Sequence, residues 1–309
     1  MSGENREQDM GPIPHWTGEM LTLGGHEVHV RSTPTGAEQN AVFVHGLAGS
    51  STNWTDLMDR LKDIVRGHAI DLPGNGYSPE PDDADYSIAA HAQAVIDLIE
   101  HVSDTPVHLF GNSLGGAVSV RVAALRPDLV RSLVLVSPAL PDLLPRYGPA
   151  RVALSTLPGI GVWAIERMRM IPAERRTSAT LGMCYADASR VHPARFDEAV
   201  EELRRRDGLP YAGAALVGCA RAIVSEYFRR GEENLWRQAA RVTAPTLVMH
   251  GRHDRLVRPS MAARAGRTFP RVRLVLLPLA GHVAQMEFPE AVARESRLLI
   301  RDATALAVG

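Results

Sequence analysis

A serine stands between glycines in the stretch FGNSLGG, which runs from Phe110 to Gly116. Apolar residues precede it, as in a buried strand, and the residues from Leu114 onward have helical character. A Gly-x-Ser-x-Gly turn between a strand and a helix holds the serine hydroxyl at the edge of the sheet. The helix N-terminus beside the hydroxyl favours developing negative charge. The pattern therefore predicts Ser113 as a catalytic nucleophile, although the pentapeptide by itself also occurs by chance.

A serine hydroxyl is a weak nucleophile at neutral pH and needs a general base, most often a histidine oriented by a carboxylate. The chain has 12 histidines, so position must select among them. His282, in PLAGHVAQMEFPE, directly follows the last predicted strand and is placed at the same sheet edge as Ser113. We expect His282 to act first as the general base and then as the general acid.

The carboxylate that orients His282 is expected to be Asp254. It lies in GRHDRLVRP, just past the end of the preceding predicted strand, and completes the chain order Ser, Asp, His. An acid directly after the strand SLVLVS is the competing position, but Ser137 and Pro138 occupy it. Asp142 lies nearby and is interpreted as a turn residue.

Acyl transfer also requires hydrogen-bond donors for the oxyanion, and backbone N–H groups commonly supply them. One donor is expected to be the amide of Leu114, the residue after the nucleophile. The second is expected from the loop HGLAGSS, where the Leu47 amide is favoured over that of Ala48. The alternative interpretation of this loop is a glycine-rich turn without a catalytic role.

An alternating frame of strands and helices is predicted to position these residues. EMLTL and HEVHVRS alternate apolar and polar residues around Gly24 and Gly25, which is typical of a hairpin. AVFVHG, HAID, VHLFG and SLVLVS are short apolar runs, as in strands covered on both faces of a parallel sheet. Between them, SIAAHAQAVIDLIEHV has helical spacing behind an N-cap at Ser87. The alternation indicates a parallel, right-handed α/β core.

A helical cap, or lid, is predicted over residues 141–241. The stretch from about Pro141 to Arg241 has helix-like segments, many arginines and no convincing buried strand. Beyond it, APTLVMHG and RLVLLPLAG restore the strand pattern, and PEAVARESRLLIRDA has the spacing of an amphipathic helix. The core is thus expected to comprise residues 17–140 and 242–309, after a flexible arm at 1–16.

The composition favours a protein that acts on a small molecule. The 309 residues are 45% hydrophobic and 22% charged with a formal net charge of -1, so we expect an ample core and no nucleic-acid partner. Cys184 and Cys219 lack a CxxC spacing, which argues against a disulfide framework or a zinc site. The N-terminus has no signal-peptide pattern, and no apolar run reaches the roughly 20 residues of a membrane span. We expect a cytoplasmic monomer or homodimer.

The chain resembles the α/β-hydrolase superfamily over most of its length. The matching landmarks are, in order, VHGLAGSSTNW, DLPGNGYS, GNSLGG, GRHDRLVRP and AGHVAQMEFPE. The resemblance implies an α/β fold with a mostly parallel eight-stranded sheet, helices on both faces and a helical cap inserted after the sixth strand. It also implies a Ser-His-Asp mechanism with an acyl-enzyme and without a cofactor or metal. In DLPGNGYS, Asp71 and Gly74 are interpreted as residues of a structural turn.

Within the superfamily the landmarks point in two directions. The GNS turn, Asn53-Trp54 and GHVAQMEFPE are similar to carbon–carbon bond hydrolases of the meta-cleavage type, which act on ring-fission products. The loop HGLAGS is more similar to general esterases and to the cofactor-free haloperoxidase-like group. Serine at position 113 argues against the haloalkane dehalogenases and epoxide hydrolases, which use an aspartate nucleophile.

The leading prediction is a serine hydrolase that cleaves an ester of a small or medium apolar acid. One alternative is hydrolysis of a carbon–carbon bond in a vinylogous diketone, and another is a non-catalytic ligand-binding member of the fold. Apolar cap residues are expected to favour a hydrophobic acyl or aromatic group, with packing inside the cap as the alternative for most of them. These residues are Leu157, Ile160, Val162, Trp163, Ile165, Met168, Met170 and Ile171.

Overall fold

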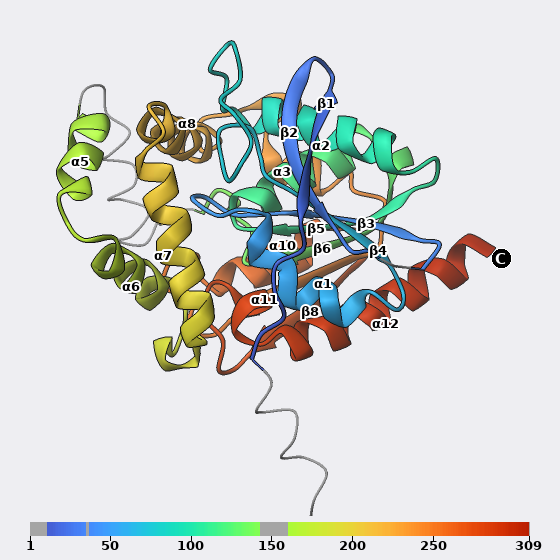
Figure 1. Cartoon of the computed structure of the whole chain (residues 1–309). Helices are drawn as coiled ribbons and strands as arrows, with labels where there is room; N and C mark the ends of the chain where they lie inside the picture. The colour runs from blue at the N-terminus through green and yellow to red at the C-terminus, as the bar shows by residue number, and fades with distance from the viewer. Residues whose placement is uncertain (1–10, 35–36, 143–159, 309) are drawn as a thin grey trace, which may run out of the picture.

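The computed structural model describes residues 11–34, 37–142 and 160–308. They form an eight-stranded sheet in the order β1-β2-β4-β3-β5-β6-β7-β8 (Figure 1). Strands β1 and β2 run antiparallel to each other, β2 runs antiparallel to β4, and the other neighbours are parallel. The strands are β1 Gly18–Leu23, β2 His26–Ser32, β3 Asn40–Val44, β4 Arg66–Ile70, β5 Val107–Asn112, β6 Val130–Val136, β7 Thr246–Gly251 and β8 Val272–Leu277. The predicted mostly parallel α/β architecture is confirmed.

Helices cover both faces of the sheet, and each face has its own hydrophobic core. One core includes apolar residues of α2, α3, α9 and α10, and the other includes those of α1, α11 and α12. The sheet is therefore buried on both sides, which explains the continuous apolar runs of the central strands. The helices are α1 Thr55–Leu61, α2 Ile88–Val102, α3 Leu114–Leu125, α9 Leu235–Ala239, α10 Ser260–Thr268, α11 Ala284–Glu287 and α12 Pro289–Val308.

Two local predictions from the sequence are confirmed by the backbone. Gly24 and Gly25 join β1 to β2 with φ values of 56° and 86°, a left-handed pair that two-residue hairpin turns require. Helix α2 begins after Ser87, whose hydroxyl accepts a hydrogen bond from the Ala90 amide at 3.1 Å. The N-cap satisfies one of the free amides of the first helical turn.

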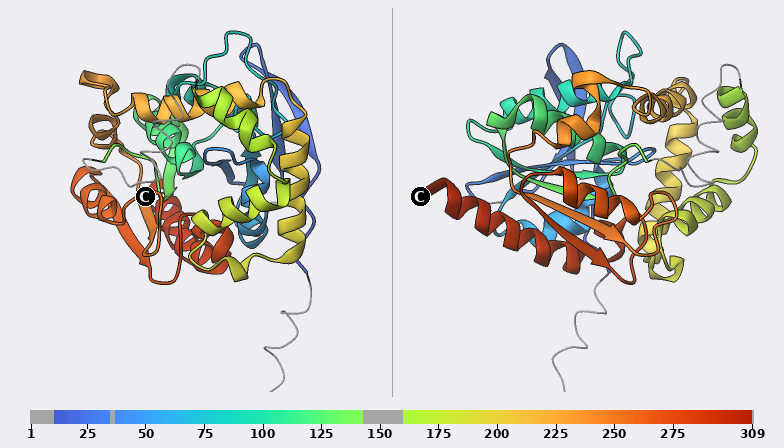
Figure 2. Two further views of the ribbon diagram at one scale, coloured as in Figure 1. Left: turned by 90° about the vertical axis from the view of Figure 1, so that its left-hand side faces the viewer. Right: turned by 180° about the vertical axis from the view of Figure 1, so that it is seen from behind.

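A helical cap follows β6, as predicted, and stands beside the sheet (Figure 1, left; Figure 2, left, facing the viewer). Helix α5 lies on its outer side and packs on α8, and α6 packs on α7. Arg121 on α3 pairs with Glu226 after α8, at 3.1 and 3.0 Å, and ties the cap to the core. The cap helices are α5 Ile160–Arg169, α6 Ala173–Cys184, α7 Pro193–Asp207 and α8 Ala212–Ser225.

The predicted apolar lining of the cap needs correction. Leu157 and the side chains of Ile160 and Val162 lie outside the described residues. Trp163, Met168, Met170 and Ile171 are exposed, with Met170 at 77%, so they do not form a core of the described cap. Ile165 is half-buried, and none of these five residues lines the cavity that contains Ser113. The physical reason is the outer position of α5, which turns this segment away from the sheet edge.

Cys184 and Cys219 are both free thiols. No single helix in the described parts of the chain is long and apolar enough to cross a membrane. Helices α7 and α8 meet the length and composition requirements only as a pair, and the pair is bent by 105°.

Candidate active site

Ser113 occupies a strained turn between β5 and α3. Its φ of 54° and ψ of -115° lie outside the regions that L-residues ordinarily adopt, which costs on the order of 1–3 kcal/mol. The surrounding glycines are required by close backbone contacts. A Cβ at Gly111 would lie 2.4 Å from the Gly115 carbonyl oxygen, and a Cβ at Gly115 would lie 2.1 Å from that of Val44. The turn can therefore form only because Gly111 and Gly115, two positions to either side of Ser113, have no side chains.

His282 lies in the loop between β8 and α11, at the carboxyl end of the parallel strands. Its Nδ1 is 2.9 Å from the Oδ2 of Asp254, and its backbone amide donates to the Cys184 carbonyl at 2.6 Å. The second contact comes from the end of α6, so the cap holds the backbone of this loop. The predicted histidine and carboxylate are thus hydrogen-bonded partners.

Asp254 is completely buried after β7. Its Oδ1 accepts hydrogen bonds from the amides of Leu256 and Val257 at 2.8 and 2.9 Å. Burial alone would raise the pKa of Asp254, but the charges of His282 and His250 and the hydrogen bonds from His282 and Val257 together outweigh burial, and the pKa falls to about 2. The carboxylate is therefore ionised at neutral pH and favours a proton on Nδ1 of His282.

A second histidine, His250, was not singled out in the sequence. It lies in β7, is fully buried, and places Nε2 3.4 Å from the same Oδ2 of Asp254. The only feature of the sequence that indicated His250 was its position four residues before Asp254. Its apolar neighbours in the strand gave it the character of a buried structural residue. Two imidazoles thus flank one carboxylate, and of the two only His282 lines the cavity.

Ser113 and His282 both line a cavity of about 760 Å³ between the sheet edge and the cap. The core contributes the loop after β3, Ser113 and the His282 loop, and the cap contributes α6, α7 and α8. Asp142, interpreted as a turn residue, also lines this cavity, and its carboxylate lies 4.0 Å from Arg258. The volume falls within the range of pockets that enclose small ligands.

The loop after β3 lies against the serine turn. A Cβ at Gly46 would lie 3.1 Å from that of Ser113. The Gly49 amide donates to the Gly46 carbonyl at 3.0 Å, which closes a tight turn with Leu47 and Ala48 at its centre. Leu114 begins α3, so its amide belongs to the first turn, where no intrahelical acceptor is available. Gly46, which directly precedes Leu47, thus lies close to Ser113, and Leu114 directly follows Ser113 in the chain.

Asp71 is a structural residue of the neighbouring loop, as predicted. Its buried carboxylate accepts hydrogen bonds from the amides of Ser51 and Tyr77, at 2.5 and 2.9 Å, and contacts Nδ1 of His29 at 2.8 Å. Gly74 has a φ of 77° in the same loop. These contacts hold the loop after β4 to the end of the loop after β3, which lines the cavity.

The model of the Alpha/beta hydrolase family matches residues 41–295, which include Ser113, Asp254 and His282. The chain belongs to the alpha/beta hydrolase family. This alpha/beta hydrolase is therefore an enzyme, a hydrolase, rather than the non-catalytic ligand-binding protein that was the second alternative.

Two curated relatives illustrate the range of the family. This alpha/beta hydrolase is 26% identical over 275 residues to a 2-hydroxy-6-oxononadienedioate/2-hydroxy-6-oxononatrienedioate hydrolase of Cupriavidus pinatubonensis, with 86% of this chain and 88% of the relative covered. It is 26% identical over 279 residues to a pimeloyl-[acyl-carrier protein] methyl ester esterase of Nitrosomonas europaea, with 85% and 95% covered. Both are hydrolases, but the reactions in their names differ.

A solved structure shows the same fold. The meta-cleavage product hydrolase of Pseudomonas fluorescens IP01 superposes with a TM-score of 0.75 at 20% identity, with 93% of this chain and 98% of that chain covered. At this identity the similarity establishes the architecture alone. The choice of bond and substrate must come from the site.

Proposed function

We propose that this alpha/beta hydrolase cleaves an ester of a small or medium apolar acid through a covalent acyl-enzyme. One observation carries the proposal: the strained Ser113 and the Asp254-bonded His282 face the same cavity. A serine and a histidine oriented by a carboxylate are the parts that nucleophilic acyl transfer needs.

In the first half of the proposed reaction, the Ser113 Oγ attacks the ester carbonyl carbon. The hydroxyl proton passes to Nε2 of His282, and Asp254 stabilises the imidazolium through Nδ1. The amides of Leu47 and Leu114 donate to the oxyanion. Collapse of the intermediate breaks the bond to the alkoxy oxygen, which leaves as the alcohol with the proton from His282.

In the second half, water replaces the alcohol. His282 removes a proton from the water, the hydroxide adds to the acyl carbon, and a second oxyanion forms in the same hole. Its collapse releases the acid and returns the proton to Ser113. No cofactor or metal enters this scheme.

The cavity walls support an apolar acyl group. Side chains from the three inner cap helices that line it are mostly aliphatic or sulfur-containing, and methionine adapts to irregular shapes. They include Leu181, Met183, Leu203, Ile223 and Val224. The two free thiols accord with the reducing cytoplasm as the proposed location.

Hydrolysis of a carbon–carbon bond in a vinylogous diketone is the second candidate. It is favoured by the similarity to the Cupriavidus pinatubonensis enzyme, whose name specifies an oxo-dienedioate substrate. The loop HGLAGS, which is more similar to the corresponding loop of general esterases, favours the ester instead. Turnover of a diketone far above that of simple esters would select this candidate.

Active-site labelling tests the proposed function. The wild type, Ser113→Ala and His282→Ala are treated with a fluorophosphonate, and intact mass with peptide mapping locates the adduct. We expect one adduct on wild-type Ser113, none on Ser113→Ala and strongly slowed labelling of His282→Ala. Folded wild type that takes up no label would overturn the serine mechanism. A labelled enzyme then proceeds to a panel of acyl esters and diketones.

A further inference from the structure

The C-terminal half of the cap helix α7 contacts the loop that carries Leu47. Nη1 of Arg206 donates to the carbonyl oxygen of Ala48 at 2.6 Å. One helical turn earlier, Glu202 accepts a hydrogen bond from the Ser50 hydroxyl at 3.0 Å. Residues four apart lie on the same helix face. Helix α7 therefore places the carboxylate of Glu202 and the guanidinium of Arg206 side by side against one short loop.

The loop needs support because its turn is strained. In the turn from Gly46 to Gly49, Ala48 occupies the third position with a φ of 60°. A positive φ at the third position distinguishes a type II turn from a type I turn, and glycine or asparagine normally occupies that position. With alanine this conformation costs on the order of 1 kcal/mol or more. A change in the backbone of Ala48 that relieved the strain would disturb the turn in which the Leu47 amide lies.

The core holds the far end of this loop. The Ser50 amide donates to Asn53 Oδ1 at 3.1 Å, and the Ser51 amide donates to Asp71. The bond to the Ala48 carbonyl comes instead from the cap. The strained position is therefore held by a residue of a different part of the chain.

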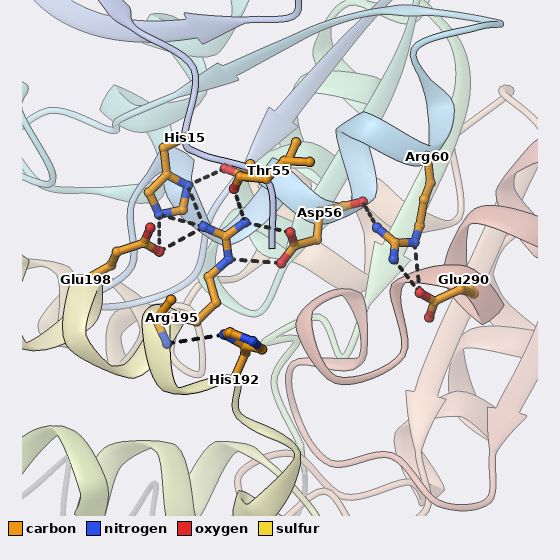
Figure 3. Close-up of polar contacts among 10 residues, drawn as sticks. His15, Thr55, Asp56, Arg60, His192, Arg195, Glu198 and Glu290 are labelled. Atoms are coloured by element: carbon orange, nitrogen blue, oxygen red, sulfur yellow. Dashed lines mark hydrogen bonds and ion pairs between the residues drawn. The ribbon is translucent and has the colours of Figure 1, made fainter. Parts of the chain in front are cut away.

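Helix α7 is itself anchored to the core at its other end (Figure 3). Arg195 forms a two-point contact with Asp56 on α1, at 2.6 and 3.2 Å. It also donates to the Ile13 carbonyl at 2.8 Å, so this part of the expected N-terminal arm is bonded to the cap. Glu198 lies 2.8 Å from Arg195 and 3.0 Å from Nε2 of His15. Because both ends of α7 are bonded to the core, the position of Arg206 relative to the loop after β3 is fixed.

We propose that Arg206, supported by Glu202, is a positioning residue that holds the Leu47 amide in its oxyanion-binding orientation. The cap thereby completes the oxyanion hole in addition to enclosing the substrate. This inference rests on the proposed function, because it assigns a task within the same reaction. In this role Arg206 acts through the loop and not directly on the reacting atoms.

A second task for Arg206 would be direct binding of a negatively charged substrate group, since the residue also lines the cavity. The two roles differ kinetically. A positioning residue affects the transition state and therefore kcat, whereas a ground-state contact to the substrate affects KM. The hydrogen bond to Ala48 favours the first role.

The test compares Arg206→Met with Arg204→Met in ester hydrolysis. Arg204 lies on the same helix, is exposed and pairs with Glu174 and Glu201, so its variant controls for loss of one arginine. We expect Arg206→Met to lower kcat about 10- to 100-fold with KM unchanged. We expect Arg204→Met to match the wild type. Circular dichroism and thermal unfolding confirm that each variant is folded.

An oxyanion mimic provides a second readout. A trifluoromethyl ketone adds to an active serine as a hemiketal whose oxygen occupies the oxyanion hole, whereas the parent methyl ketone binds without this charge. Arg206→Met is expected to lower the affinity for the trifluoromethyl ketone by the same factor as it lowers kcat. The affinity for the methyl ketone is expected to stay unchanged. Equal weakening of both ketones would contradict the proposal.

The strained alanine provides a rescue experiment. Glycine adopts a positive φ without strain, so Ala48→Gly combined with Arg206→Met should recover much of the lost kcat. A raised KM with unchanged kcat in Arg206→Met, or the absence of any rescue, would overturn the positioning role. Fluorophosphonate labelling of wild-type Ser113 distinguishes failure of the proposed function from failure of the Arg206 role. If Ser113 is not labelled, the proposed function fails. If Ser113 is labelled, only the role of Arg206 is in question.

Discussion

The imidazole of His282 and the carboxylate of Asp254 meet at 2.9 Å, Nδ1 to Oδ2, although 28 positions separate the two residues in the chain. Strands β7 and β8 run parallel, so the loops that follow them emerge at the same edge of the sheet. Asp254 is fully buried beneath the histidine, and its two backbone hydrogen bonds fix the carboxylate. This pair is the basis of the first prediction.

Asp254→Asn should lower kcat for ester hydrolysis by about 10⁴-fold, because the amide cannot stabilise the imidazolium and disfavours the required tautomer. His250→Gln is the matched variant, since His250 contacts the same carboxylate at 3.4 Å but does not line the cavity. We expect kcat of His250→Gln to fall by no more than about 10-fold. Steady-state kinetics measure both, and similar losses for the two variants would contradict the assignment of His282 as the base.

The glycines of the serine turn can be tested against a glycine with free space. A methyl group at Gly115 would meet the Val44 and His45 carbonyl oxygens at 2.1 and 2.5 Å, whereas one at Gly182 meets nothing within 4 Å. Gly115→Ala should lower the free energy of unfolding by about 2–4 kcal/mol and abolish fluorophosphonate labelling. Gly182→Ala in α6 should raise it by up to about 1 kcal/mol and leave labelling intact. Urea unfolding gives both values; an active Gly115→Ala enzyme would refute the steric argument.

Buried histidines predict acid-sensitive stability. Burial lowers the pKa of His68 and His108 to about 4, and that of His91 to about 3, from 6.5. The unfolded chain therefore takes up protons first, so these groups leave stability intact above about pH 6.5 and reduce it as the pH falls toward 4. The loss at about pH 5 is on the order of 1–2 kcal/mol per histidine.

His108→Gln tests this linkage. His108 contacts the Ser132 hydroxyl and the Gln39 side chain, both at 2.8 Å, and glutamine supplies uncharged polar groups at this position. Between about pH 7.5 and about pH 5, the variant should lose less free energy of unfolding than the wild type. Identical pH dependence of the two proteins would show that His108 is not a source of the acid sensitivity.

The position of Leu203 in the cavity wall leads us to expect that its size influences which acyl lengths the enzyme accepts. This residue lines the cavity, so Leu203→Trp should reduce the volume available to the substrate. We expect kcat/KM for an octanoate ester to fall about 10-fold relative to an acetate ester, since each buried methylene contributes roughly 1 kcal/mol. Leu298→Trp is the control, because this residue is exposed on α12. An unchanged octanoate-to-acetate ratio would place the acyl group elsewhere.

Short-range patterns were sufficient to predict much of the frame. The hairpin at Gly24 and Gly25, the N-cap at Ser87 and the turn around Ser113 each follow from the conformational preferences of a few adjacent residues. The alternation of apolar runs and helical spacing likewise indicated a parallel sheet, because strands buried on both faces must be apolar throughout. Parallel strands place their carboxyl ends together, so the approach of His282 to Asp254 could be inferred from topology.

Contacts between distant segments could not be read from such patterns. Met170 has the character of a buried residue and is nevertheless exposed, because α5 occupies the outer side of the cap. Arg206 has the character of a surface residue and nevertheless bonds to Ala48, 158 positions away, because α7 packs over the loop after β3. The sequence by itself determined which residues carry reactive groups and how the chain turns around each of them. Only the tertiary structure decided which side chains from remote segments share the cavity, because helix packing is set by the sum of many weak contacts spread over the whole chain.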